Sequence, residues 1–176
     1  MFLDFLFGKK HLLNQVSKIP QVPIESHRAT APGTNIGYSA DLVSQLEAEH
    51  VKLAQIFTAI GQAFDAGDVV TTVAHLEKFR SAIQAHLLTE NVRLYIYLEH
   101  ALAQDAISHA LIHDFRHEMD SIGKAVLSFL GKYRELDTQP NLTISFGSDL
   151  SAIGKVLVER IQREESTLYP LYLPAY

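Results

Sequence analysis

Hydrophobic residues recur at steps of three and four along four long stretches of this chain, which is the spacing of amphipathic α-helices. The four helices are expected at residues 39–65, 70–102, 106–134 and 148–169. Three of these helices begin at a residue with a short polar side chain, which is suited to cap a helix. The first begins at Ser39 or Asp41, the third at Asp105 and the fourth at Ser148. No glycine or proline separates the second helix from the third, but one helix of that length is improbable, so a break is placed at 103–105.

Four amphipathic helices joined by mostly short turns predict an all-α fold, an antiparallel up-down four-helix bundle. The bundle domain is expected at residues 39–176, preceded by an irregular N-terminal arm at residues 1–38. Prolines and glycines make a long helix in the second half of this arm unlikely to form, because they interrupt helical hydrogen bonding. They are Pro20, Pro23, Pro32, Gly33 and Gly37. The apolar start of the arm offers a contact for a protein partner or a membrane surface through Phe2, Leu3, Phe5, Leu6 and Phe7.

The amino-acid composition limits the metal ligands, partners and locations to be expected. The chain has 176 residues, no cysteine and nine histidines, so a metal site here would use nitrogen and oxygen ligands rather than thiolates. The net charge of -5 gives no reason to expect a nucleic-acid partner. No apolar run is long enough for a transmembrane segment, and no secretory signal is evident, so the expected location is cytoplasmic.

Polar residues interrupt two of the apolar helix faces. His86 and Glu90 are four residues apart, and both fall on the apolar face of the second helix. His50 fills a gap in the apolar face of the first helix, between Leu46 and Leu53. Burying such groups without partners costs several kcal/mol, roughly, so either a metal ion or other side chains must satisfy them.

Counting residues from the turns, at about 1.5 Å of helix per residue, predicts which side chains share a level in the bundle. The count lands near Glu118 on the third helix and near Arg160 on the fourth. These two residues should therefore meet the two histidines, Glu90 and Glu164 in one layer of the core. The predicted metal ligands are His50, His86, Glu90, Glu118 and Glu164.

The third helix offers a second set of candidate ligands. His109, His113 and His117 are spaced by four residues, but this row lies beside the apolar face rather than within it. Glu118 is in step with Phe115 on the apolar face. Because only one face can turn inward, Glu118 is preferred as the ligand, and the three histidines are expected at the boundary or in solvent.

Three segments of the chain resemble the hemerythrin-like HHE family, and the resemblance covers about residues 38–174. The matching segments are Leu46-Glu47-Ala48-Glu49-His50, His86-Leu87-Leu88-Thr89-Glu90-Asn91, and Arg160-Ile161-Gln162-Arg163-Glu164-Glu165 with the following Leu168-Tyr169-Pro170. The resemblance implies a non-haem iron centre, usually di-iron, held inside the bundle by histidines and bridging carboxylates. It also implies roles in oxygen binding, oxygen or redox sensing, responses to nitric oxide, or iron handling.

Two features depart from the family pattern. Arg160 stands where the family usually has a histidine, and an arginine is not a normal metal ligand. The third helix also lacks a clear inward histidine. The site is therefore expected to be either a carboxylate-rich di-metal centre that uses Glu118, or a layer in which the Arg160 guanidinium replaces one metal or all of them.

The preferred function is a metal-binding protein, with iron as cofactor, that binds or senses oxygen or another small diatomic ligand or handles iron. The alternative is a metal-free bundle that acts as a regulatory or protein-interaction module. A di-iron ferroxidase or oxygenase ranks third, because nothing in the sequence identifies a pocket for an organic substrate. No nucleophile motif, phosphate loop or dinucleotide fingerprint points to another class of enzyme.

Overall fold

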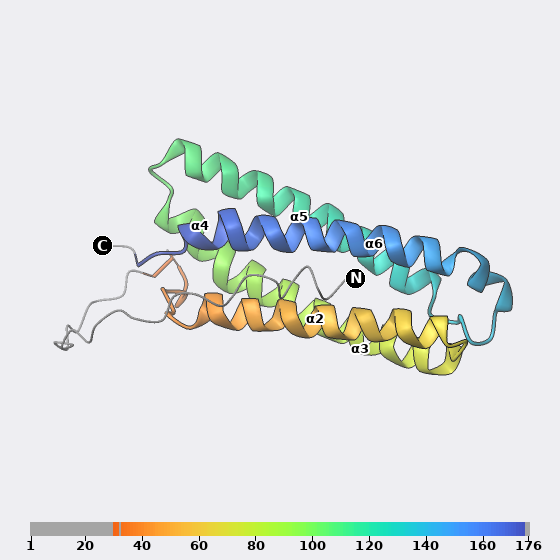
Figure 1. The fold of residues 1–176 in the computed structure, drawn as a ribbon. Helices are drawn as coiled ribbons and strands as arrows, with labels where there is room; N and C mark the ends of the chain where they lie inside the picture. Colours follow the sequence, from red (N-terminus) through yellow and green to blue (C-terminus); the bar gives the residue numbers. More distant parts are fainter. Residues whose placement is uncertain (1–29, 32, 175–176) are drawn as a thin grey trace.

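The computed structural model describes residues 30–31 and 33–174, and this part of the chain forms an antiparallel bundle of long helices (Figure 1). The predicted all-α bundle is confirmed. Its helices are α2 (Leu42–Asp65), α3 (Val69–Thr89), α4 (Ile96–Ala101), α5 (Ala106–Lys132) and α6 (Thr143–Arg163). A π-helical segment, η1 (Glu90–Tyr95), joins α3 to α4, and a second one, η3 (Glu164–Leu168), extends α6. Short 3₁₀ turns, η2 (Pro140–Leu142) and η4 (Tyr169–Leu171), precede and follow this last helix.

The predicted boundaries of the first three helices agree with the structure to within a few residues. Asp68 and Asp105 cap α3 and α5, because each side chain accepts a hydrogen bond from a backbone N–H in the first turn. Gly67, in the turn before α3, has a positive φ of 75°, a conformation that glycine adopts without strain.

The predicted start of the last helix is wrong. We expected Ser148 to cap this helix at its start, but α6 begins at Thr143. Pro140 opens the preceding 3₁₀ turn, and its carbonyl accepts a hydrogen bond of 2.6 Å from the Thr143 hydroxyl. Gly147 lies within the helix, where a Cβ would lie 3.5 Å from the Phe64 ring of α2. Gly147 therefore lies inside α6, beside α2, one residue before the start that we expected.

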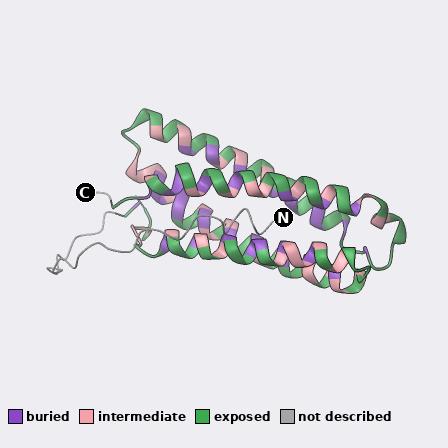
Figure 2. Ribbon diagram, viewed as in Figure 1, coloured by how far each residue is buried: buried purple, intermediate pink, exposed green. Residues whose placement is uncertain are grey.

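Buried residues lie on the sides of the helices that face one another, and exposed residues lie on the outer sides (Figure 2). They form two apolar clusters. One, near the α2–α3 and α5–α6 turns, includes Phe57, Ile60, Phe79, Val126, Phe129 and Phe146. The other, at the α4 end, includes Leu42, Leu46, Leu94, Tyr97, Ile112 and Leu168. Among the described helices, none is long and apolar enough to cross a membrane.

The two ends of the described chain meet beside α4. The backbone N–H of Ser39 donates to the Tyr172 hydroxyl at 2.9 Å, and the ring of Tyr38 stacks on that of Tyr172 with centroids 5.1 Å apart. The proposed contact through Phe2 and the apolar residues after it lies outside the described residues. The described end of the arm therefore packs on the bundle through Tyr38.

Candidate metal centre

Four potential metal ligands converge between the two apolar clusters. They are His50 of α2, His86 of α3, and the first residues of the two π-helical segments, Glu90 and Glu164. All four are buried, and one ligand atom from each lies within 4.8 Å of the others. The Nε2 atom of His50 lies 3.2 Å from both His86 Nε2 and Glu164 Oε2, and His86 Nε2 lies 3.8 Å from Glu90 Oε2. The predicted convergence of these four residues is observed.

Each histidine also contacts a carboxylate on its outer side. The Nδ1 atom of His86 donates to Glu49 at 2.9 Å, and Nδ1 of His50 donates to Glu165 at 3.1 Å. A carboxylate acceptor at Nδ1 turns Nε2 toward the centre, and it makes the deprotonated imidazole a better ligand. We did not predict these two residues, although Glu49 precedes His50 and Glu165 follows Glu164 in the sequence.

Tyr169 covers the centre on the α4 side. Its hydroxyl donates to Glu90 Oε1 at 3.0 Å and lies 3.3 Å from His50 Nε2. Its ring is nearly parallel to that of His50, at 12°, with centroids 5.8 Å apart. The phenol therefore holds one Glu90 oxygen and one imidazole in place.

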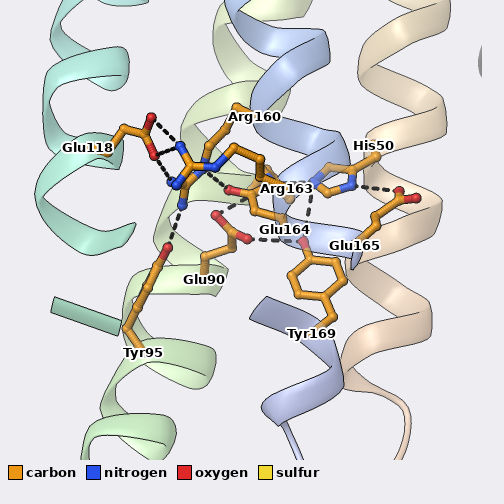
Figure 3. Close-up of polar contacts among 10 residues, drawn as sticks. His50, Glu90, Tyr95, Glu118, Arg160, Arg163, Glu164, Glu165 and Tyr169 are labelled. Carbon is orange, nitrogen blue, oxygen red and sulfur yellow. Dashed lines mark hydrogen bonds and ion pairs between the residues drawn. The ribbon is translucent and has the colours of Figure 1, made fainter. Parts of the chain in front are cut away.

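Arg160 is buried and contacts Glu164 through the carboxylate oxygen that does not face His50 (Figure 3). Its Nε donates to Glu164 Oε1 at 2.5 Å, its Nη1 to Glu118 Oε2 at 2.9 Å, and its Nη2 to the Tyr95 hydroxyl at 2.6 Å. The guanidinium carbon stands 4.7 Å from the centre of the Phe115 ring, a cation–π geometry. This guanidinium therefore has partners on its edge and on its face.

Glu118 is not among the converging ligand atoms. Both of its oxygens accept hydrogen bonds of 2.5 Å from Arg163, and one also accepts from Arg160. Its side chain is 38% exposed, whereas the adjacent Met119 is buried. The structure thus brings together four of the five predicted ligands and makes the fifth an ion-pair partner of two arginines. His109, His113 and His117 are exposed, as we expected.

The protonation of the buried groups differs from one to the next. Burial alone would lower the pKa of His50, but hydrogen bonds to Glu164 and Glu165 outweigh it and raise that pKa to about 9. Burial and the positive charge of His50 lower the pKa of His86. Burial, with the negative charge of Glu164 added, raises the pKa of Glu90 to about 8. Burial acts to raise the pKa of Glu164 too, but His50 and Arg160 keep it below its usual value.

The geometry of these residues fits a metal ion. Among the described residues, Glu90 Oε2 is the one buried side-chain oxygen or nitrogen without a hydrogen-bond partner. It lies 3.8 Å from His86 Nε2, too far for a hydrogen bond. A buried carboxylate oxygen without a partner is costly, and a cation would satisfy it. Two imidazole nitrogens and two carboxylate oxygens also form a common ligand set for divalent transition metals.

The two π-helical segments carry the same residue pattern. His86, Glu90, Leu94 and Tyr95 correspond in spacing to Arg160, Glu164, Leu168 and Tyr169. We did not recognise this internal repeat in the sequence, although its spacing is visible there. A π-helix has a wider turn than an α-helix, so glutamate and tyrosine five residues apart both point inward. The repeat identifies Tyr95 and Tyr169 as parts of the centre.

A cavity of about 30 Å³ adjoins the ligands on the side opposite Tyr169. Its lining is apolar apart from His50, His86, Arg160 and Glu164, and it includes Phe57, Phe79, Leu87, Met119, Gly123 and Val126. A water molecule needs at least roughly 10–15 Å³ on this scale, so the cavity admits a molecule of diatomic size.

A comparison with protein families is consistent with this geometry. The family model described as hemerythrin HHE cation binding domain matches residues 41–172, which include all the residues of the centre. Searches of curated proteins and of solved structures found no match. Because this match covers most of the sequence, the chain belongs to the hemerythrin HHE cation-binding domain family.

Proposed function

We propose that this protein binds iron at His50, His86, Glu90 and Glu164, and that it binds or senses a small diatomic molecule there. The observation that carries the proposal is Glu90 Oε2, a buried carboxylate oxygen without a hydrogen bond, beside two imidazole nitrogens and a second carboxylate. Imidazole and carboxylate ligands suit Fe(II), and iron held by four protein ligands would supply an open position for a diatomic ligand.

The residues around the four ligands each support this function. Glu49 and Glu165 orient the imidazoles through Nδ1. Tyr169 holds Glu90 Oε1, which leaves Oε2 directed toward the other ligand atoms. The apolar cavity beside the ligands favours a small uncharged molecule and disfavours water, because few polar groups line it. A cavity of about 30 Å³ does not fit an organic substrate, which favours binding or sensing over an oxygenase.

The test is an anaerobic titration with Fe(II), followed by nitric oxide as the diatomic probe. We expect iron to bind to the wild-type protein and nitric oxide to produce a visible absorption band. Glu90→Ala should abolish the band, because it removes the oxygen that lacks a partner. Glu99→Ala is the matched control: Glu99 is an ion-pair partner of Arg116 outside the centre, so this variant should keep the band.

Failure to bind iron would contradict the proposal. It would favour a metal-free bundle in which Arg160 and the protonated His50 satisfy the carboxylates. Iron binding with no response to nitric oxide would contradict the proposed diatomic ligand alone, and iron handling would then be the better interpretation.

A further inference from the structure

We infer that Arg160 takes the place of a second cation and limits this centre to one metal ion. The inference rests on the proposed function, because it concerns the number of metal ions at the same site. It makes Arg160 the residue that determines the stoichiometry of the centre.

The internal repeat gives the first argument. In α3 a histidine, His86, lies four residues before Glu90, and both side chains face the centre. In α6 the corresponding place, four residues before Glu164, belongs to Arg160. Both α-helices change to π-helix at the glutamate, so the two places are structurally equivalent. One half of the repeat therefore supplies an imidazole and the other a guanidinium.

The bonding of Glu164 gives the second argument. Its Oε2 lies 3.2 Å from His50 Nε2, on the side of the four converging ligands, whereas its Oε1 accepts from Arg160 at 2.5 Å. A carboxylate that divides its two oxygens in this way has the arrangement of one that bridges two cations. Here the Arg160 guanidinium is the cation on the outer side (Figure 3).

The remaining contacts of Arg160 show why a second metal ion would be excluded. The guanidinium also holds Glu118 and the Tyr95 hydroxyl, the oxygens nearest to it that could complete a second ligand set. It is buried, its face is covered by Phe115, and an arginine stays protonated at any relevant pH. A metal ion beside Glu164 Oε1 would have to displace this group and would meet its charge in a poorly solvated interior.

The experiment counts metal ions. We would load the protein with excess Co(II), remove unbound metal by gel filtration, and measure the bound ions by native mass spectrometry. We expect one ion in the wild-type protein and two in Arg160→His. That substitution frees Glu164 Oε1 and the Tyr95 hydroxyl and adds an imidazole at the place equivalent to His86. Arg163→His is the matched control. Arg163 also binds Glu118, and its guanidinium carbon lies 4.8 Å from the centre of the Phe115 ring, but its side chain is half-exposed. This variant should still bind one ion.

The outcomes are distinct. Two ions in the wild-type protein would overturn the inference and leave the proposed function intact, whereas no ion would overturn both. A folded Arg160→His variant that still binds one ion would also overturn the inference. If this variant does not fold, the Co(II)-loaded wild-type protein still decides. Its electron paramagnetic resonance spectrum should show a single uncoupled high-spin ion, and a spin-coupled pair would contradict the inference.

Discussion

At the scale of single residues, the centre consists of polar side chains that hold one another in position through hydrogen bonds and ion pairs. Glu164 is held by Arg160 and His50, and each imidazole is held by an outer carboxylate. Buried groups of this kind depend strongly on their partners, because removing one partner leaves the other charged or polar in a poorly solvated interior. The residues that touch the ligands should therefore affect metal affinity almost as much as the ligands do.

Glu49 provides a direct test at this scale. Glu49→Ala removes the acceptor of His86 Nδ1, so the imidazole loses both its fixed orientation and part of its basicity. We expect metal affinity to fall roughly 10–100-fold, as is usual when such a carboxylate is lost. Glu49→Gln should lie between this variant and the wild type, because an amide oxygen can still accept the hydrogen bond. A chelator competition titration measures the affinities, and an unchanged value for Glu49→Ala would contradict the role given to Glu49.

At the scale of helices, the two π-helical segments decide which side chains reach the centre. In a regular α-helix, residues five positions apart point in directions about 140° apart, since each residue turns by about 100°. Glu90 and Tyr95 are five apart and both buried, and the same holds for Glu164 and Tyr169. The wider π turn makes this possible, and such segments are frequent at functional sites.

Helix α5 contributes a glycine to the cavity, which allows a test of the proposed diatomic ligand. A Cβ at Gly123 would lie 3.6 Å from Leu87, an ordinary contact, so Gly123→Ala should fold and its methyl group should enter the lining of the cavity. We expect nitric oxide to bind roughly tenfold more weakly to the iron-loaded variant, the scale of one misplaced methyl group in an apolar pocket. Iron affinity should not change.

Gly131→Ala is the control for this variant. Gly131 lies on the same helix with nothing within 4 Å of a Cβ, so both variants should gain the same roughly 0.5–1 kcal/mol of helix stability. Only Gly123→Ala should alter the binding of nitric oxide, measured by absorbance titration. Equal affinities in the two variants would show that the diatomic ligand binds elsewhere.

At the scale of the whole molecule, the centre lies between two apolar clusters that are each formed by several helices. The Leu53–Phe57 side of α2 belongs to the first cluster and the Leu42–Leu46 side to the second, with His50 between them. The bundle should therefore fold without metal, since the apolar packing does not depend on the four ligands. Metal binding should then add stability to a bundle that is already folded.

This added stability is measurable. A ligand at about 100 times its Kd stabilises a folded protein by roughly 2.7 kcal/mol. For a chain of this size, such a change raises the Tm by roughly 5–10 °C. We expect this rise with Fe(II) under anaerobic conditions and its reversal by a chelator, followed by scanning calorimetry. Glu90→Ala should melt cooperatively but show no rise, and a wild-type protein that unfolds when metal is removed would contradict the separate role of the two clusters.

The sequence by itself determined the helices and most of the ligand layer. Apolar residues at steps of three and four define the inward faces of α2, α3 and α5, and His50, His86 and Glu90 lie in step with them. Counting along helices of constant rise then places Glu164 at the same level. These features depend on local periodicity, which a single chain displays without its partners.

Tertiary packing decided the features that periodicity leaves open. Glu118 and Met119 both fit the inward spacing of α5, and packing turned Met119 into the core because two arginines of α6 hold Glu118 at the boundary. The outer carboxylates, the inward turn of Tyr169 and the bonding of Arg160 likewise depend on which helices lie side by side. A rotation of about 100° separates neighbouring residues of a helix, and contacts between helices, rather than propensities within one, select which of two neighbours faces the core.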